Sequence, residues 1–316
     1  MKATRLGGWL LAIALVGCEQ GGATKKDETS AEVNATASAT AAATASISAT
    51  ASASAAPPKA DPSRLNLSGK SVQGGLMKAQ IDPATRGIKF PGHRVIISPE
   101  GVFLIAFYRN APPKEKLTIT FPDGAVLEHD FTVEQRTFED DRIDGLPERW
   151  VKLDPATKKK LRSTNARLDK IRMGYTKEAH HEDGFIWPSE GRITSRYGQK
   201  RYLNGIDSGI HWGVDIAVPV GTPVKAPAGG RVTFAETGVP LAGNTVVIDH
   251  GHGLSSTLIH LDRIAVKVGQ EVKQGDVVAT VGMTGRTNGP HLDWRMNLFE
   301  VRIDPELLAP AMPGEQ

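Results

Sequence analysis

Five residues in the C-terminal part of the chain are of types that bind metal ions and transfer protons. They are three histidines and two aspartates: His211, Asp215, His260, His291 and Asp293. Imidazole nitrogens and carboxylate oxygens are ordinary zinc ligands, and a catalytic zinc usually has three protein ligands plus a water. The residue types therefore suit a metal-dependent reaction.

The spacing of these residues decides which of them can share one ion. His291 and Asp293 are two apart, and residues i and i+2 of a strand point to the same face. His211 and Asp215 are four apart, which is about 13 Å on an extended strand and too far for one ion. Gly213 and the Pro-rich surroundings disfavour a helix there, whereas a tight bend at Gly213 would bring the pair together. Spacing alone therefore does not decide which of these residues bind the same ion.

The elements that must position these residues are predicted to be strands. From residue 184 to residue 316, glycines and prolines separate many short strand-like runs, among them GRITSRYG, GRVTFAE, NTVVIDHG, SSTLIHL, DVVATVG and HLDWRMN. No long helical pattern interrupts them. We therefore expect an all-β domain over residues 184–316.

Residues 64–150 are expected to form a small β-sandwich domain. The runs HRVIIS, VFLIAFY and KLTITF are rich in β-branched and aromatic residues. Asp123 and Gly124 give a turn signal between two such runs, as in a hairpin. We expect this domain to position the C-terminal one, and the alternative is that it covers the active groove as an inhibitory segment.

Residues 151–183 are expected to form a linking helix, which makes the chain mainly β with one helix between two β domains. Asp154 is a plausible N-cap, with a proline at the first helical position. Leu161, Leu168 and Tyr175 recur every seven residues and predict one narrow apolar stripe. The basic residues on the other faces are expected to be solvated.

The N-terminus carries export signals. Residues 1–18 have a basic start, a short apolar run from Trp9 to Val16, and the only cysteine of the chain, Cys18. This is typical of a secretory signal peptide, which is too short to span a bilayer stably. The sequence LVGC resembles a bacterial lipobox, which implies lipid attachment at Cys18. An ordinary signal peptide with an incidental cysteine is the alternative. Glu19 favours the outer membrane, facing the periplasm.

Residues 19–63 are rich in alanine, serine and threonine and predict a disordered tether. Such a tether would let a lipid-anchored protein reach from the membrane into the cell wall. The whole chain has 316 residues, of which 40% are hydrophobic, and this suits a protein with one or two folded domains. The net charge of +3 is compatible with an anionic cell-wall polymer. No basic run interleaved with aromatics suggests nucleic acid.

Three blocks of the C-terminal domain resemble the M23 zinc metallopeptidases, the LytM or lysostaphin-like cell-wall endopeptidases. The blocks are HWGVDIAVPVGTPVKAPAGGRV, GNTVVIDHGHGLSSTLIHL and VKVGQEVKQGDVVATVGMTGRTNGPHLDW. The resemblance implies a β-sheet groove with zinc at its floor, in which His211 and Asp215 are ligands. It implies that His260 and His291 lie beside the attacking water and contact the transition state. The family usually has a histidine as third ligand where this chain has Asp293.

Asp293 is therefore the departure from the pattern. An aspartate oxygen binds zinc at about 2.0–2.2 Å, but its side chain is shorter than histidine, so the ion or the backbone must shift. A second carboxylate brings the net charge of the zinc site to about zero, which lowers the acidity of bound water. We expect a weaker or altered metal site.

The resemblance implies a zinc-dependent endopeptidase that hydrolyses peptide bonds of peptidoglycan. The first alternative is a catalytically weak or inactive module that binds and activates a cell-wall amidase. The second is a lipoyl- or biotinyl-like carrier, which VKVGQEVKQGDVVATVG resembles in part. A carrier needs a modified lysine at a hairpin tip, which the sequence does not suggest, and export also argues against it.

Several other residues are weaker candidates. Tyr197 or Tyr202 could donate to an oxyanion, and His250 and His252 lie in a Gly-rich stretch where exposed turn histidines are the simpler interpretation. His180 and His181 are adjacent, and adjacent residues on a helix do not share a face. Isolated histidines at 93 and 129 are expected to be at the surface or satisfied within the fold.

Overall fold

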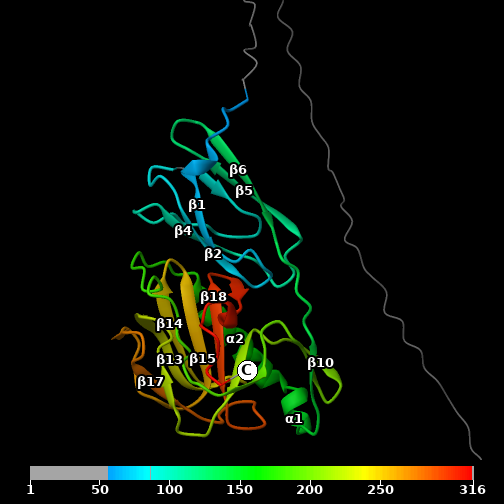
Figure 1. Ribbon diagram of the computed structural model, residues 1–316. Coiled ribbons are helices and arrows are strands. Elements are labelled where there is room, and N and C mark those ends of the chain that lie inside the picture. The colour runs from blue at the N-terminus through cyan, green and yellow to red at the C-terminus, as the bar shows by residue number, and fades with distance from the viewer. Residues whose placement is uncertain (1–55, 86, 315–316) are drawn as a thin grey trace, which may run out of the picture. The chain divides into compact units, whose positions relative to one another are not determined.

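The computed structural model describes residues 56–85 and 87–314 (Figure 1). The predicted signal peptide, Cys18 and nearly all of the predicted tether lie outside the described residues. Within them, no helix is both long and apolar enough to cross a membrane. The structure is mainly β, as the sequence predicts.

The N-terminal part contains two three-stranded sheets that share one core. The first sheet has the order β1-β2-β4 and the second β3-β5-β6. Phe103 and Ile105 of the first sheet are fully buried against Leu117 and Ile119 of the second. The Asp123-Gly124 turn joins two strands as predicted, and the Asp123 carboxylate accepts a hydrogen bond from the Ala125 amide at 3.0 Å. The elements are η1 (Pro62–Arg64), β1 (Asn66–Gly69), β2 (Leu76–Gln80), β3 (Gly87–Lys89), β4 (Val102–Ala106), β5 (Lys114–Thr120) and β6 (Val126–Thr132).

The run HRVIIS, which the sequence predicts as a strand, is not one. Residues 93–98 pair with no neighbouring strand. Its apolar side chains nevertheless alternate, since Val95 and Ile97 pack on the sandwich core and Ile96 packs on the C-terminal core. The segment is therefore held by side-chain packing on two cores, and this pattern has the same period as a strand.

The segment between the two β regions contains one short and one long helix. Strand β7 (Asp140–Ile143) and helix α1 (Glu148–Val151) precede helix α2 (Pro155–Arg172). The predicted N-cap is confirmed, because the Asp154 carboxylate accepts a hydrogen bond from the Thr157 amide at 2.9 Å. Helix α2 ends at Arg172, short of the predicted residue 183. Met173 is the C-cap, and Gly174, which follows it, is a poor helix former. Tyr175, which the predicted apolar stripe includes, thus lies beyond the helix.

The C-terminal part is built on a ten-stranded antiparallel sheet whose central order is β16-β13-β14-β15-β18-β11-β8. A smaller sheet, β10-β9-β7, joins the region before the helices to the start of this part. The elements are β8 (Arg192–Ser195), β9 (Lys200–Leu203), β10 (Ile206–Ile210), β11 (Gly213–Ala217), β12 (Pro223–Lys225), β13 (Gly230–Val239), β14 (Gly243–Gly251), β15 (Leu254–Ile264), β16 (Glu271–Val272), β17 (Val277–Val281), β18 (Leu292–Leu298), β19 (Val301–Ile303) and η2 (Pro305–Leu307).

Strand β18 separates the core from the site. Trp294, Met296 and Leu298 are buried in the apolar core. Alternation along the strand therefore directs Asp293 and Arg295 to the opposite face. One strand thus anchors the sheet by one face and supplies charged groups by the other.

His250 on β14 belongs to a fully buried hydrogen-bond chain. Its Nδ1 lies 2.6 Å from the carbonyl oxygen of Gly229, and its Nε2 lies 2.8 Å from Ser256 Oγ. A carbonyl only accepts, so Nδ1 carries the proton, and Nε2 accepts from the serine. Ser256 Oγ in turn accepts from the Trp294 indole at 3.1 Å. This arrangement needs a neutral imidazole, and burial lowers the pKa of His250 to about 4.

We expect His250 to make the fold sensitive to acid. Its pKa in the folded protein is lowered, so its contribution is fully present above pH 6.5 and is lost as the pH falls from 6.5 towards 4. On going from pH 7 to pH 5, protonation of this group alone should lower the free energy of unfolding by about 2 kcal/mol. Denaturant unfolding at both pH values should show a pH dependence that is smaller by this amount in His250→Asn. An equal pH dependence in the variant and the parent would contradict the assignment.

Candidate metal centre

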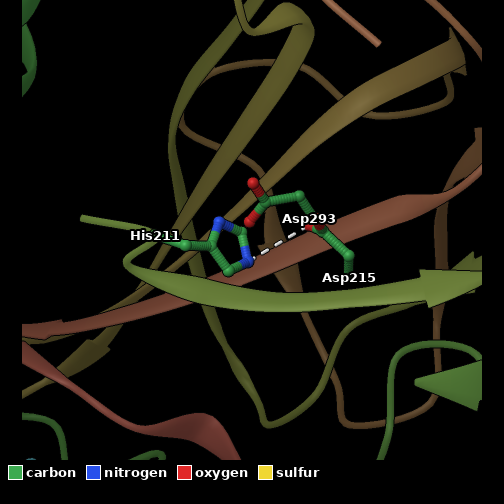
Figure 2. Close-up of side chains that lie close together, drawn as sticks. All are labelled: His211, Asp215 and Asp293. Carbon is green, nitrogen blue, oxygen red and sulfur yellow. Dashed lines mark ion pairs between the residues drawn. The ribbon is translucent and has the colours of Figure 1, made fainter. Parts of the chain in front are cut away.

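His211 and Asp215 face each other although they are four positions apart in the sequence (Figure 2). His211 lies in the connection between β10 and β11, and Asp215 lies in the middle of β11. Because the connection precedes the strand, the chain does not extend over the whole interval, and His211 Nε2 comes to 3.3 Å from Asp215 Oδ1.

Gly213 permits this arrangement by its small size. It does not have the positive φ of a left-handed turn. A Cβ at Gly213 would instead lie 2.5 Å from Asp293 Oδ1 and 2.6 Å from the carbonyl oxygen of Trp294. The tight bend expected at Gly213 is thus not made by a left-handed glycine, and glycine is needed at this position because β18 approaches it closely.

Asp293 completes a group of three possible ligands. It lies directly opposite Asp215 in the antiparallel pair β11-β18. One nitrogen or oxygen from each of His211, Asp215 and Asp293 lies within 4.8 Å of the others (Figure 2). The sheet register therefore sets Asp215 opposite Asp293, and the connection before β11 brings His211 to them, so the three residues that the sequence resemblance assigns to the metal lie together.

The hydrogen bonding of this group fits a cation. Neither ring nitrogen of His211 has a hydrogen-bond partner within the described part of the chain, and the same holds for Asp215 Oδ1. His211 is only 2% exposed. Buried polar atoms are almost always satisfied, so an unsatisfied imidazole facing an unsatisfied carboxylate oxygen suits a bound divalent metal ion.

Two arginines lie against the carboxylates and alter the charge of the site. Arg201 Nη2 donates to Asp215 Oδ2 at 2.9 Å, and Arg201 Nε donates to Asp141 Oδ2 at 2.8 Å. Arg295 donates to Asp293 through Nε and Nη2, at 2.9 and 2.6 Å. The expected net charge of about zero counts only the zinc ion and the two carboxylates, and leaves out these arginines. With Arg295 beside Asp293, the second carboxylate is neutralised locally.

These contacts keep both carboxyl groups ionised. Burial raises the pKa of Asp293, but the Arg295 guanidinium more than offsets it and holds this pKa below its ordinary value. Burial likewise raises the pKa of Asp215, and His211 and Arg201 more than offset it. Arg201 occupies Oδ2 of Asp215, so the free oxygen, Oδ1, is the one that faces His211.

His260 is directed to the site by a strand irregularity. The register of β15 against β14 shifts between Leu258 and Leu261, and His260 itself has a φ of 63°. Such a bulge redirects a side chain. Nδ1 of His260 lies 2.8 Å from the carbonyl oxygen of Thr284 and therefore donates to it, which leaves Nε2 as the basic nitrogen. Burial lowers the pKa of His260 to about 4, so the ring is neutral near pH 7.

His291 is held in a similar way. Its Nδ1 lies 2.9 Å from the carbonyl oxygen of Gly289, and its Nε2 lies 3.8 Å from Asp215 Oδ1. The rings of His260 and His291 are 4.8 Å apart. Both therefore stand beside the group of three ligands, with Nδ1 committed to the backbone.

The weaker candidates lie elsewhere. The hydroxyl of Tyr197 donates to the carbonyl oxygen of Arg302 at 2.9 Å, and Tyr202 lies under the guanidinium of Arg142. Neither tyrosine lines the cavity that contains the metal group. His250 and His252 are buried, so the expectation of exposed turn histidines is wrong.

The other histidines have structural surroundings. His180 and His181 follow the end of α2, and the ring of His181 packs against that of His252 at 5.2 Å. His93 is stacked between Phe90 and Tyr108, and neither of its nitrogens has a partner among the described residues. The expectation of a surface or satisfied histidine thus does not hold in full, because His93 is half-buried and its ring nitrogens lack partners among the described residues. His129 packs against Phe131.

A cavity of about 640 Å³ opens over the metal group. His211, Asp215, His260 and His291 line it on the side of the main sheet. Residues between Asp141 and Arg172, from β7, α1 and α2, form another part of its wall. The described residues of the sandwich do not line it, so the segment after the sandwich, and not the sandwich itself, borders the groove.

Sequence reasoning missed the arginines. Arg295 was accessible to it, because a residue two positions after Asp293 on a strand shares its face. Arg201 and Asp141 carried no local signal, since β7 and β9 are distant in sequence and meet only in the parallel pair of the small sheet.

Comparisons with known proteins agree with this geometry. Residues 209–305 match the model of Peptidase family M23. The chain carries an M23 peptidase domain. The match contains all five candidate site residues, His211, Asp215, His260, His291 and Asp293.

Relatives extend the comparison. The cell division protein DipM of Caulobacter vibrioides is 38% identical over 129 residues, which are 41% of this chain and 20% of DipM. The peptidoglycan DD-endopeptidase ShyA of Vibrio cholerae is 39% identical over 110 residues, 34% of this chain and 25% of ShyA. The chain thus spans only a fifth to a quarter of these two relatives.

One solved structure resembles more than the M23 domain. It is a candidate M23 peptidase from Pseudomonas aeruginosa, 27% identical, with a TM-score of 0.58. The similarity covers 75% of this chain and 94% of that one. It therefore reaches beyond residues 209–305, into the described regions that precede the M23 domain.

Proposed function

We propose that this protein is a zinc-dependent endopeptidase that hydrolyses peptide bonds in peptidoglycan. The observation that carries the proposal is the buried group of His211, Asp215 and Asp293, in which the nitrogens of His211 and one oxygen of Asp215 lack partners among the described residues. The relatives ShyA and ShyB of Vibrio cholerae, both named peptidoglycan DD-endopeptidases, support the substrate class.

The three ligands would hold zinc, which would polarise the scissile carbonyl and increase the acidity of a water. His260 acts as the base, because its ring is neutral near pH 7 and its Nε2 is free of the backbone bond that holds Nδ1. His291, whose Nδ1 donates to the Gly289 carbonyl, presents Nε2 to the same space, and only as an imidazolium does it donate a hydrogen bond from Nε2 to the developing oxyanion. His260 then returns the proton that it took from the water to the leaving amine.

The arginines adjust the ligands. Arg201 fixes the carboxylate of Asp215 so that Oδ1 faces His211. Arg295 neutralises Asp293, so that an aspartate at the third ligand position does not lower the positive charge on a bound metal as much as an unpaired one would.

The chain acts from a lipid anchor at Cys18, in the outer membrane and facing the periplasm, with residues 19–63 as the tether.

A second function has one observation in its favour. Both oxygens of Asp293 accept hydrogen bonds from Arg295, which competes with metal binding at the third position. A protein with a weakened metal site would act by binding and activating a cell-wall amidase. The relative named a cell division protein, DipM, is consistent with such a role for a similar domain.

Digestion of purified peptidoglycan distinguishes the two functions. We expect the protein to release fragments cut at cross-link peptides and to lose this activity with a chelator, and added zinc should restore it. Stoichiometric metal in the purified protein should accompany the activity. Intact muropeptides in both samples, together with stimulation of an amidase, would overturn the peptidase proposal.

A further inference from the structure

Arginines dominate the charged lining of the cavity. Within the described residues it is lined by Arg172, Arg201, Arg286, Arg295 and Arg302 and by three aspartates, Asp141, Asp169 and Asp215. Asp293 pairs with Arg295 behind the lining, so five guanidinium groups stand against four carboxylates, which leaves an excess of one positive charge at the space where a substrate would lie.

The arginines differ in how they are paired. Arg201 and Arg295 are engaged by the carboxylates of the metal group. Arg302 instead donates to the amide oxygen of Asn297 at 3.0 Å, and Arg286 donates to the carbonyl oxygen of Trp150 at 3.0 Å. These last two therefore keep a full positive charge with an uncharged acceptor.

Arg172 supplies the decisive observation. It is the last residue of α2, and its side chain is only 6% exposed. Its Nε has no hydrogen-bond partner among the described residues. Its Nη1 is 3.3 Å from Asp169, whose own side chain is 66% exposed, so this pair is weak. A buried guanidinium that lines a cavity and has an unused N–H donor can donate a hydrogen bond to an oxygen of a bound ligand.

Sheet register brings three of these arginines together. Arg172 Nη2 reaches Thr257 Oγ1 at 3.4 Å, and Thr257 is the cross-strand partner of Arg295. Arg302 is the cross-strand partner of Asn297, which lies two residues after Arg295 on β18 and so shares its face. Burial, followed by the charges of Arg172 and Arg295, lowers the pKa of Arg302 to about 9. An anion bound among them would relieve this repulsion.

We propose that Arg172 and Arg302, with Arg295 beside them, form a subsite that binds a free carboxylate of the substrate peptide. This rests on the proposed function, because the peptides of peptidoglycan carry free carboxylates close to their cleavable bonds. A guanidinium presents paired N–H donors that match a carboxylate. Helix α2 thus contributes to substrate recognition although it lies outside the M23 match.

Binding to metal-free protein tests the subsite without requiring hydrolysis. The probes are a peptidoglycan stem tetrapeptide with free carboxyl groups and the same peptide with these groups converted to amides. Calorimetry at low ionic strength should show about tenfold tighter binding of the acid form. The preference should disappear in Arg302→Gln and in Arg172→Gln. It should persist in Arg162→Gln, a matched loss of charge at an exposed position of the same helix.

Each outcome decides the matter. Equal affinity of the parent protein for the two peptides overturns the subsite, and this comparison needs no variant to fold. Binding of inorganic phosphate without a preference for the acid peptide also overturns it. A preference for the acid form, together with intact cross-links after digestion of peptidoglycan by the metal-loaded protein, supports the subsite and overturns the peptidase proposal. Cleavage of the cross-links, together with equal affinities for the two peptides, does the reverse.

Discussion

Replacing Asp215 by asparagine is expected to lower peptidoglycan hydrolysis by about a thousandfold or more and to remove stoichiometric metal. Asp215 lies next to three other side chains of the site. Its Oδ1 lies 3.3 Å from His211 Nε2 and 3.8 Å from His291 Nε2, and its Oδ2 is held by Arg201. An amide keeps the shape of the side chain but lacks the charge that a metal requires.

Asp141→Asn is the matched control for this change. Asp141 and Asp215 are both ion-paired with Arg201, so each substitution removes one carboxylate from the same guanidinium. Only Asp215 belongs to the metal group. We expect Asp141→Asn to retain metal and to keep activity within about tenfold of the parent, since it affects the ligand only through its orientation.

The comparison separates two causes. Metal content, measured by elemental analysis, and the rate of fragment release should fall together in Asp215→Asn. If the two variants lose activity equally while both retain metal, Asp215 acts through Arg201 and not as a ligand. If Asp215→Asn keeps full activity, the metal centre is placed wrongly.

Strand alternation made part of the candidate metal centre predictable from the sequence. The period of two correctly places Asp293 on the face of β18 opposite the buried Trp294, and the resemblance supplies its partners elsewhere in the chain. Local turn and cap chemistry likewise predicts the hairpin at Asp123 and the start of α2 at Asp154. These features depend on neighbours within a few residues, so the sequence carries their signal directly.

Other features depend on contacts between distant residues. The end of α2 at Arg172 and the absence of a strand at residues 93–98 depend on what each segment packs against. Arg201 reaches Asp215 because β9 pairs with β7, which contributes Asp141. The bulge that directs His260 arises from a register shift between strands β14 and β15. Patterns within one segment do not contain this information.

Changing Asp293 to histidine, the residue usual in the family, is expected to destabilise the fold. Asp293 is 1% exposed and accepts three hydrogen bonds from Arg295, whose side chain is 26% exposed. Histidine would leave this guanidinium without its carboxylate. Breaking a buried ion pair in this way should cost about 2–4 kcal/mol in the free energy of unfolding, measured by denaturant titration. The approach of Gly213 to Asp293 leaves little room for the larger ring.

A double-mutant cycle separates the lost ion pair from the steric effect. Arg295→Gln removes the charge that Asp293 neutralises, so the double variant Asp293→His/Arg295→Gln contains neither partner. If the pair is what the single change disrupts, the double variant should recover about 1–3 kcal/mol relative to the sum of the single changes. Additive losses would mean that crowding at Gly213 and not the ion pair causes the damage.

The same variants test why an aspartate can occupy a ligand position. If Asp293 and Arg295 act as a unit, the double variant has a neutral ligand and no adjacent guanidinium, and it should bind metal at least as well as the parent. The single variant should bind metal less well, since Arg295 then places an unpaired positive charge beside the ion. Equal metal affinity in the single and double variants would show that Arg295 serves the fold alone. In that case the aspartate, without help from Arg295, would set the strength of the metal site.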